Sequence, residues 1–202
     1  MILKNLGNQD YLTTYHKMQE FTKNRDKHTN DELWYVSHNP VFTQGLAGNK
    51  KHLLHNSDNI PVIKTDRGGQ ITYHGPGQII IYCLIDIKRL NLAVREMVTK
   101  IEDSIIKLLN DYDIKGSRLD KAPGVYINGA KIAALGLKIH KGKSYHGLSL
   151  NVDMDLQAFS MINPCGYKNL KVTQMKDLTN KHLNYDDIVK SLANYLVRNF
   201  YG

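Results

Sequence analysis

The sequence predicts a single domain of the α+β class (mixed α/β), with a mixed sheet flanked by helices. Three observations lead to this prediction. The chain has 202 residues, and no internal repeat or Pro/Gly/Ser-rich linker divides it. Segments with helical and with strand periodicity are mixed, without the regular alternation of a doubly wound sheet. Asn128-Gly129, between two apolar segments, is a strong hairpin signal and indicates antiparallel pairing.

The first half of the chain predicts one helix and three strands. Residues 9–24 form the helix, because four side chains that can be buried recur at helical spacing. These are Tyr11, Tyr15, Met18 and Thr22. Residues 33–37 and 61–65 have the composition of short strands, and 79–87 is an apolar run rich in β-branched residues, which is typical of a buried strand.

The second half predicts two helices around a β-meander. Residues 93–111 and 186–201 carry apolar side chains at i, i+3 and i+4. The first stripe consists of Val94, Met97, Val98, Ile101, Ile105, Leu108 and Leu109, and the second of Ile188, Val189, Leu192, Leu196 and Phe200. Between the helices, strands at 124–127, 130–140 and 144–152 are joined by turns at Asn128-Gly129 and Lys141-Gly142.

Composition restricts the class of protein. The net charge is +8, from 27 basic and 19 acidic residues, so acidic partners are favoured: nucleic acid, an anionic membrane or a small acidic carrier protein. The alternative is a basic surface without such a partner. Two cysteines are too few for a disulfide framework, and no Cys/His spacing suggests a metal site. The apolar run at 79–87 is about half of a membrane span, and residues 1–8 lack a signal-peptide pattern, so we expect a cytoplasmic protein with reduced thiols.

The densest candidate for a binding site is the segment 67–78, which holds four glycines in twelve residues. Glycines let a backbone approach a ligand closely and turn its N–H groups inward. Arg67, Tyr73 and His74 add polar groups to this predicted loop. The alternative is a turn-rich connection without a ligand. The segment lacks the Gly-Lys-Ser/Thr ending of a phosphate-binding P-loop.

The two cysteines have different surroundings. Cys165 lies between Pro164 and Gly166, which predicts a tight loop where a thiol can be exposed and reactive; the alternative is a spare loop cysteine. Cys83 lies inside the apolar run at 79–87 and is predicted to be a small buried hydrophobe.

Lys131 begins a predicted strand whose alternation places it on the same face as Ala133, Leu135, Leu137 and Ile139. A lysine held against an apolar face should have a lowered pKa, which suits proton transfer. The alternative is that Lys131 flanks the strand and reaches solvent. The alternation could also shift at Gly136.

Of the nine histidines, His74 and His146 each precede a glycine. We expect His74 to be the better candidate for a site and His146 to be structural. No pair of histidines has convincing metal spacing.

Four blocks of sequence resemble the octanoyltransferases of the lipoate pathway. They are Arg67 to Gln78, Gly124 to Gly136, His146 to Val152 and Asn163 to Gly166, and the resemblance runs from about Thr43 to Leu178. Thr173-Gln174-Met175 departs from the Thr-Ser-Leu of many members. The resemblance implies the fold of the biotin and lipoyl protein ligases, as one catalytic domain over residues 1–202.

The resemblance also implies roles for residues. Cys165 resembles the acyl-bearing nucleophile, and Lys131 resembles the lysine that lowers the pKa of that thiol. Three segments resemble the walls of the acyl pocket and give the expected substrate-binding residues. These are Arg67, Gly68, Gly69, Gln70, Ile71, Thr72, Tyr73, His74, Ala134, Leu135, Gly136, Gly147, Leu148 and Ser149.

The partners implied are octanoyl-acyl carrier protein as donor, and the lipoyl domains of 2-oxoacid dehydrogenase complexes and the glycine cleavage H protein as acceptors. No cofactor or metal is expected, neither nucleic acid nor a membrane is expected as a partner, and a monomer is the default. Two rival functions remain open. One is an ATP-dependent lipoate or biotin ligase of the same fold, in which a nucleophilic cysteine is unnecessary. The other is a basic nucleic-acid-binding protein, which predicts clustered basic residues with exposed aromatics.

Overall fold

The computed structural model describes residues 1–54, 59–120, 122–164 and 170–202. The strands are β1 (Ile2–Gln9), β2 (Glu32–His38), β3 (Val41–Gln44), β4 (Val62–Lys64), β5 (Ile71–His74), β6 (Gln78–Leu84), β7 (Ser117–Leu119), β8 (Ala122–Ile127), β9 (Ala130–His140) and β10 (Lys143–Asn151). The α-helices are α1 (Tyr11–Asn24), α2 (Val94–Asp111) and α3 (Tyr185–Tyr201), and short 3₁₀ helices cover Lys50–His52, Gln157–Met161 and Met175–Asp177.

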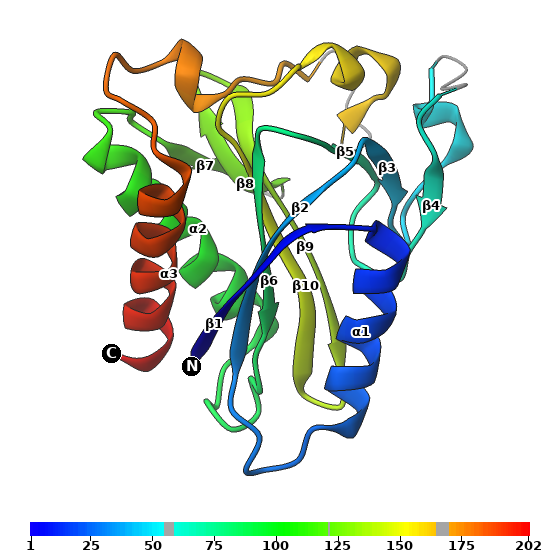
Figure 1. Ribbon diagram of the computed structural model, residues 1–202, viewed down its shortest axis with the longest axis vertical. Helices are drawn as coiled ribbons and strands as arrows, with labels where there is room; N and C mark the ends of the chain where they lie inside the picture. Colours follow the sequence, from blue (N-terminus) through cyan, green and yellow to red (C-terminus); the bar gives the residue numbers. More distant parts are fainter. Residues whose placement is uncertain (55–58, 121, 165–169) are drawn as a thin grey trace.

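A seven-stranded sheet in the order β1-β2-β6-β10-β9-β8-β7 forms the centre of the molecule (Figure 1). β1 and β2 pair in parallel, and the other neighbours pair antiparallel. A second, three-stranded sheet has the order β4-β3-β5. The mixed sheet with flanking helices confirms the predicted α+β class.

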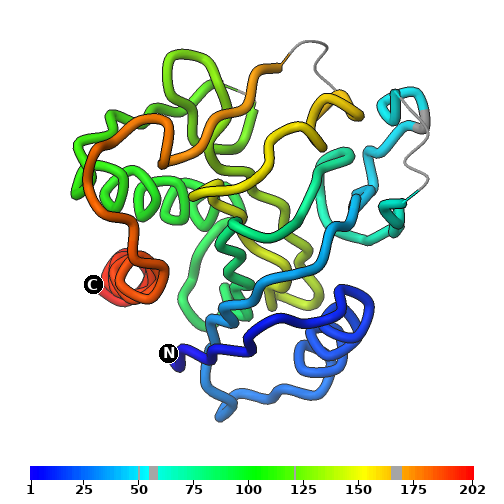
Figure 2. The backbone as a smooth tube through the Cα atoms, turned by 45° about the horizontal axis from the view of Figure 1, so that its top comes forward, coloured from blue at the N-terminus to red at the C-terminus, as the bar shows by residue number. Residues whose placement is uncertain are grey.

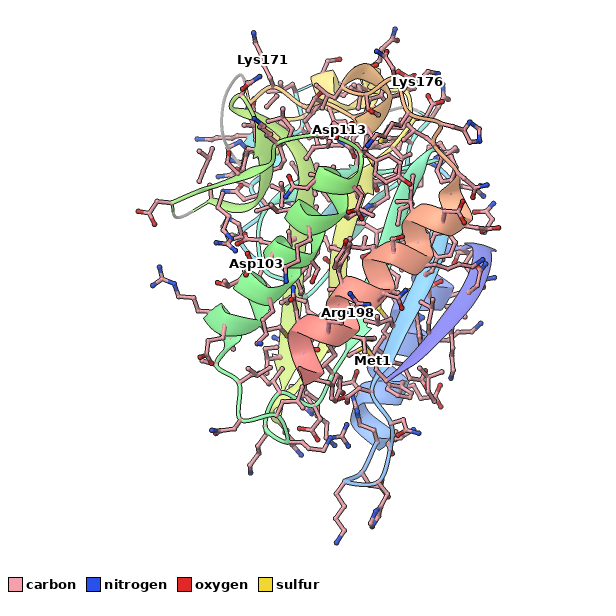
Figure 3. The ribbon with its side chains drawn as sticks, turned by 90° about the vertical axis from the view of Figure 1, so that its left-hand side faces the viewer. Met1, Asp103, Asp113, Lys171, Lys176 and Arg198 are labelled. Carbon is pink, nitrogen blue, oxygen red and sulfur yellow. The ribbon has the colours of Figure 1, made fainter. Side chains whose placement is uncertain are left out.

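Each face of the large sheet is covered by different elements. α2 and α3 run side by side across one face (Figure 3), whereas α1 lies on the other side of the sheet from α3 (Figure 2). Alternate residues of β6 divide between the two faces: Ile79, Ile81 and Cys83 join the core under α2 and α3, while Ile80 and Tyr82 join the core under α1. This two-sided burial explains the continuous apolar run in the sequence.

The predicted helices and strands are all present, with small shifts at their ends. The apolar residues of α3 and most of those of α2 are buried as expected. There are two exceptions in α2: Val94, its first residue, is 47% exposed, and Val98 is half-buried. No helix in the described part of the chain is both long and apolar enough to cross a membrane.

Four strands escaped prediction: β1, β3, β5 and β7. β1 and β7 are mostly exposed edge strands, so they lack the apolar alternation that identifies a strand. β5 lies inside the glycine-rich segment that was expected to be a loop, and its pairing with β3 is a non-local contact. The expectation of a single loop over 67–78 was therefore wrong for Ile71–His74.

The alternation of β9 is interrupted at Ile132 and not at Gly136. Opposite β8, Val125 pairs with Ala133 and Tyr126 pairs with Lys131, so Ile132 is an extra residue of a β-bulge. At Gly136 the pairing with β10 continues without a shift. The possible shift at Gly136 was therefore wrong.

Candidate active site

The main pocket lies on the sheet face opposite α2 and α3, over a block of small side chains. Gly136 on β9 pairs with Gly147 on β10, and Ala134 pairs with Ser149. Gly147 and Ser149 in turn pair with Tyr82 and Ile80 on β6. Four small residues on two adjacent strands leave a hollow that larger side chains would fill.

Arg67 and the segment after it cover this hollow. Its guanidinium is buried, and Nη2 donates to the Thr43 carbonyl at 2.5 Å and to Thr43 Oγ1 at 2.9 Å, which ties the cover to β3. The Gly68 amide donates to the Leu137 carbonyl at 2.8 Å. A Cβ on Gly136 would lie 3.0 Å from Arg67 Cδ and 3.2 Å from the Gly68 carbonyl oxygen, so a side chain here would press against the cover.

The structure brings twelve of the fourteen expected substrate-binding residues into the lining of the main pocket. They are Arg67, Gly69, Gln70, Ile71, Thr72, His74, Ala134, Leu135, Gly136, Gly147, Leu148 and Ser149. Gly68 instead lines a neighbouring groove. Tyr73 lies outside these pockets, because its ring packs against Phe42 and Phe159, with centroid separations of 5.5 and 5.6 Å.

Four lining residues were not expected in the pocket: Tyr11, Ile80, Tyr82 and His146. The sequence places Tyr11 in a helix stripe and Ile80 and Tyr82 in the apolar run, and it predicts a structural role for His146. His146-Gly147 was the one available signal, since a polar residue before a glycine can mark a special backbone conformation.

Two further cavities adjoin the main pocket, and both contain Lys131. The junction pocket has Thr72, Ala134 and Ser149 in common with the main pocket and also contains Lys131 and Pro164. The side groove shares Gly69, Gln70, Leu135 and Gly136 with the main pocket; its remaining lining is Gly68, Val94, Val98, Ala122, Pro123, Lys131 and Leu137. Lys131 therefore lies between the junction pocket and the side groove, each of which shares lining residues with the main pocket.

Lys131 is buried, with 4% of its surface exposed, and does not flank the strand into solvent. Its Nζ donates to the Pro123 carbonyl at 3.1 Å and lies 5.1 Å from the centre of the Tyr126 ring. Gly124 makes room for it: a Cβ there would lie 3.0 Å from Lys131 Cε, and the φ of +141° favours glycine.

Cys165 and Gly166 lie outside the described residues, but both flanks of their segment lie near Lys131. Pro164 lines the junction pocket with Lys131. On the other side, the Lys131 amide donates to the Lys171 carbonyl at 2.8 Å, and the Thr173 amide donates to the Lys131 carbonyl at 3.0 Å. Cys83 is fully buried, and burial raises the pKa of its thiol to about 12, which confirms it as an inert core residue.

A chain of side-chain amides fixes the orientation of His74. Asn151 Nδ2 donates to the Thr173 carbonyl at 3.0 Å, so Asn151 Oδ1 accepts from Gln78 Nε2 at 2.9 Å. Gln78 Oε1 then accepts from His74 Nδ1 at 2.8 Å. His74 therefore carries its proton on Nδ1, and its Nε2 has the lone pair. Burial lowers the pKa of His74 to about 3, so the ring is neutral.

Asp66 holds His146 beside the pocket. His146 Nε2 lies 3.0 Å from Asp66 Oδ1, and the Tyr145 hydroxyl donates to Asp66 Oδ2. Burial lowers the pKa of His146, and the carboxylate of Asp66 opposes part of that shift. Burial alone would raise the pKa of Asp66, but the hydrogen bonds from His146, Tyr145 and Tyr15 hold it well below its ordinary value. A neutral imidazole and a charged carboxylate follow.

The site offers a narrow cavity beside a buried lysine, which suits an elongated apolar group with a reactive end. Within residues 1–54, 59–120, 122–164 and 170–202, no three His, Cys, Asp or Glu side chains are grouped so that they could hold a metal ion. The Leu137 carbonyl accepts from the Gly68 amide, so the backbone N–H and C=O groups of Leu137 face the cover. Backbone groups alternate in direction along a strand, so those of Leu135, two residues earlier, face the same side.

Comparison with known sequences gives close matches. The family model of the lipoyl protein ligase A/B catalytic domain matches residues 10–197. The chain is 58% identical over 199 residues to the octanoyltransferase of Vesicomyosocius okutanii, covering 96% of this chain and 97% of the relative. It is 61% identical over 177 residues to the octanoyltransferase of Chromobacterium violaceum, covering 88% and 85% of the two chains.

Comparison with solved structures gives the same fold at low identity. The bipartite lipoate protein ligase of Thermoplasma acidophilum has a TM-score of 0.76 and 13% identity, covering 98% of this chain and 82% of that one. The biotin protein ligase of Aquifex aeolicus has a TM-score of 0.59 and 11% identity, covering 99% and 69%. At such identities the likeness concerns the fold alone, and it confirms the predicted fold of the biotin and lipoyl protein ligases.

Proposed function

The chain belongs to the lipoyl protein ligase A/B catalytic domain family, and we propose that it transfers an octanoyl group from acyl carrier protein to a lysine through a thioester on Cys165. High identity to octanoyltransferases makes it an acyltransferase that serves octanoyl transfer in lipoate biosynthesis. The donor, the covalent intermediate and the acceptors are the proposal. The acceptors are the lipoyl domains of 2-oxoacid dehydrogenase complexes and the glycine cleavage H protein. Reduced cytoplasmic thiols suit this chemistry.

One observation carries the proposal: both chain segments that flank Cys165 lie against Lys131. Pro164 shares the junction pocket with Lys131, and consecutive Cα atoms are about 3.8 Å apart. Lys131 also exchanges backbone hydrogen bonds with Lys171 and Thr173. These contacts support a Cys165–Lys131 pair across 34 residues of sequence (165 − 131).

In the first step, the Cys165 thiolate attacks the acyl carbonyl carbon. A new C–S bond forms, the tetrahedral oxyanion collapses, and the C–S bond to the carrier breaks. The Lys131 ammonium stabilises the attacking thiolate and gives its proton to the departing carrier thiolate. The Leu135 amide, on the side that faces the cover, is our candidate donor to the oxyanion.

In the second step, the acceptor lysine amine attacks the Cys165 thioester. A C–N bond forms, the C–S bond to Cys165 breaks, and neutral Lys131 takes up the proton that the amine loses. The thioester supplies the driving force, so the reaction needs no ATP. The side groove, with apolar Val94, Val98 and Leu137 leading to Lys131, suits the arm that carries either reactive group.

The net charge of +8 supports docking of acidic partners, because complementary charge speeds the encounter. The ligase alternative is separable in solution. A ligase attaches free octanoate to the acceptor when ATP is supplied. The proposed enzyme attaches an octanoyl group only when a thioester donor supplies it.

Intact-protein mass spectrometry tests the covalent step. We expect wild type mixed with octanoyl-acyl carrier protein, without acceptor, to gain one octanoyl group that hydroxylamine removes. Cys165→Ala should gain none, while Cys83→Ala, which changes the buried cysteine, should gain it as wild type does. Transfer to the acceptor without any adduct on wild type would overturn the thioester mechanism.

Replacing Lys131 tests the proton-transfer role. We expect Lys131→Met to slow adduct formation at pH 7 by about 100-fold or more, and raising the pH to restore part of the rate because more thiolate forms. Lys138→Met, on the same strand, is the matched control. An adduct that forms equally fast in Lys131→Met would contradict the role.

A further inference from the structure

Three aromatic rings line the main pocket away from the two cavities that contain Lys131. Thr72, Ala134 and Ser149 belong to both the main pocket and the junction pocket that contains Lys131, so they mark the reactive end. Tyr11, Tyr82 and His146 line the main pocket and neither of the adjoining cavities. These three side chains come from α1, β6 and β10, and we call them the end wall.

Tyr11 and Tyr82 are held from outside the pocket. The Tyr82 hydroxyl donates to His38 Nε2 at 2.7 Å, because His38 Nδ1 already donates to the Gln9 carbonyl at 2.7 Å. Tyr11 stacks on His74, with centroids 6.0 Å apart, and meets the His38 ring edge-on at 5.1 Å. Both tyrosines are 4% exposed. Their positions are therefore fixed by packing and hydrogen bonds that do not depend on a ligand.

His146 adopts a conformation that is unfavourable for its residue type. Its φ is +59° in the middle of β10, where strand alternation would turn it away from the preceding residue. Instead its ring stacks on that of Tyr145 at 5.0 Å, and both reach Asp66. His146 Nδ1 is buried and has no hydrogen-bond partner among the described residues. A strained residue with an unpaired nitrogen at the end of a cavity points to a functional constraint on the shape of that end.

The spacing of lining residues along β10 is comparable with one particular chain length. Ser149 and His146 are three residues apart, so their Cα atoms are separated by roughly 10 Å in an extended strand. An extended eight-carbon acyl chain spans roughly 9 Å from its first to its last carbon. Two more methylenes add roughly 2.5 Å and would reach the rings.

We propose that Tyr11, Tyr82 and His146 determine acyl chain length, by ending the pocket at about eight carbons. The proposal rests on the proposed function, since it assumes that the main pocket holds the acyl chain. The rigid wall discriminates because each added methylene must displace packed rings, an effect that typically amounts to tenfold or more.

Two variants open the wall from different elements. His146→Gly removes the ring and suits the positive φ, and Tyr11→Ala removes a ring from the start of α1. Binding of octanoate, decanoate and dodecanoate is measured by calorimetry, and transfer from the matching acyl carrier protein thioesters is measured alongside. We expect the preference for decanoyl over octanoyl to rise about tenfold in each variant, in both measurements.

Lys141→Gly is the matched control, because Lys141 is an exposed residue of the same hairpin with a φ of +50°. It should keep the wild-type preference. Circular dichroism checks that each variant is folded. If His146→Gly does not fold, the chain-length preference of Tyr11→Ala is the test of the proposal. An unchanged chain-length preference in a folded variant overturns the wall, whereas wild type that transfers no octanoyl group from any donor overturns the proposed function itself.

Discussion

Two carboxylates, the buried Asp31 and the half-buried Asp66, organise two regions of this molecule in different ways. The Asp31 side chain is fully buried and accepts from the guanidinium groups of Arg25 and Arg89, the Asp86 amide and the Tyr201 hydroxyl. The Asp66 side chain is 26% exposed and accepts from a neutral histidine and from the Tyr145 hydroxyl.

The difference separates a structural network from one that shapes a site. Asp31 joins the end of α1, the start of β2, the turn after β6 and the end of α3, and its charge is compensated by cations. Asp66 orients His146, and His146 lines the main pocket. A carboxylate with cationic partners stabilises the fold, whereas one with neutral partners and a cavity nearby positions a ring. Four predictions test this contrast, from the largest effect to the smallest.

Removing the two carboxylates should affect stability unequally. Asp31→Ala leaves the fully buried Arg25 guanidinium without its ion-pair partner and should lower the free energy of unfolding by about 3 to 5 kcal/mol. Asp66→Ala leaves neutral donors unsatisfied and should cost about 1 to 3 kcal/mol. Urea unfolding followed by circular dichroism measures both. Equal losses would remove the distinction between the regions.

The pH dependence of stability should separate the regions too. The pKa of His74 is lowered to about 3 by burial, so below pH 6.5 the unfolded chain takes up a proton that the folded protein does not. Stability from this residue is complete above pH 6.5 and falls toward pH 3. His74→Gln should therefore reduce the loss of stability between pH 6.5 and 5 by up to about 2 kcal/mol.

His16→Gln, which changes an exposed histidine on α1, is the control for that experiment.

Asp31 contributes to the pH dependence of stability at a lower pH than His74. Burial raises its pKa, but hydrogen bonds from Tyr201, Asp86, Arg89 and Arg25 bring it below the ordinary value, so its contribution is lost only as the pH falls below about 4. A His74→Gln profile that matches wild type from pH 6.5 to 5 would show that the pocket histidine does not couple to folding.

Activity should respond to Asp66 and not to Asp31. At a temperature where both variants are folded, Asp66→Asn should lower kcat/KM for octanoyl transfer about tenfold, or about 1.4 kcal/mol, because His146 loses its charged acceptor. Asp31→Asn should stay within about twofold of wild type. Steady-state kinetics with a lipoyl domain measure both, and a tenfold loss in Asp31→Asn would contradict the contrast.

Single hydroxyl deletions give the finest test. Tyr145→Phe and Tyr201→Phe each remove one donor to one carboxylate and should cost about 1 kcal/mol. Tyr201→Phe should cost less, since Asp31 keeps two guanidinium partners and an amide. Thermal and urea unfolding compare the pair, and a larger loss in Tyr201→Phe would reverse the expected order.

The sequence predicted the fold wherever burial leaves a local pattern. The stripe of α3 and the two-sided apolar run of β6 were readable, because helix and strand periodicity are properties of neighbouring residues. β1 and β7 were not readable, because exposed edge strands form through pairing with partners distant in sequence. β5 was hidden in a glycine-rich segment for the same reason.

The candidate site divides along the same line. The sequence by itself determined the chemical groups: a thiol between proline and glycine, a lysine at a strand start and the small residues over which the pocket lies. Tertiary structure alone decided that Lys131 is buried against residues 171–173, that Ile132 forms a bulge, and that Tyr11, Tyr82 and His146 close one cavity. The physical reason is that a pocket is the space between elements, so its shape depends on strand register and packing between residues far apart in the chain.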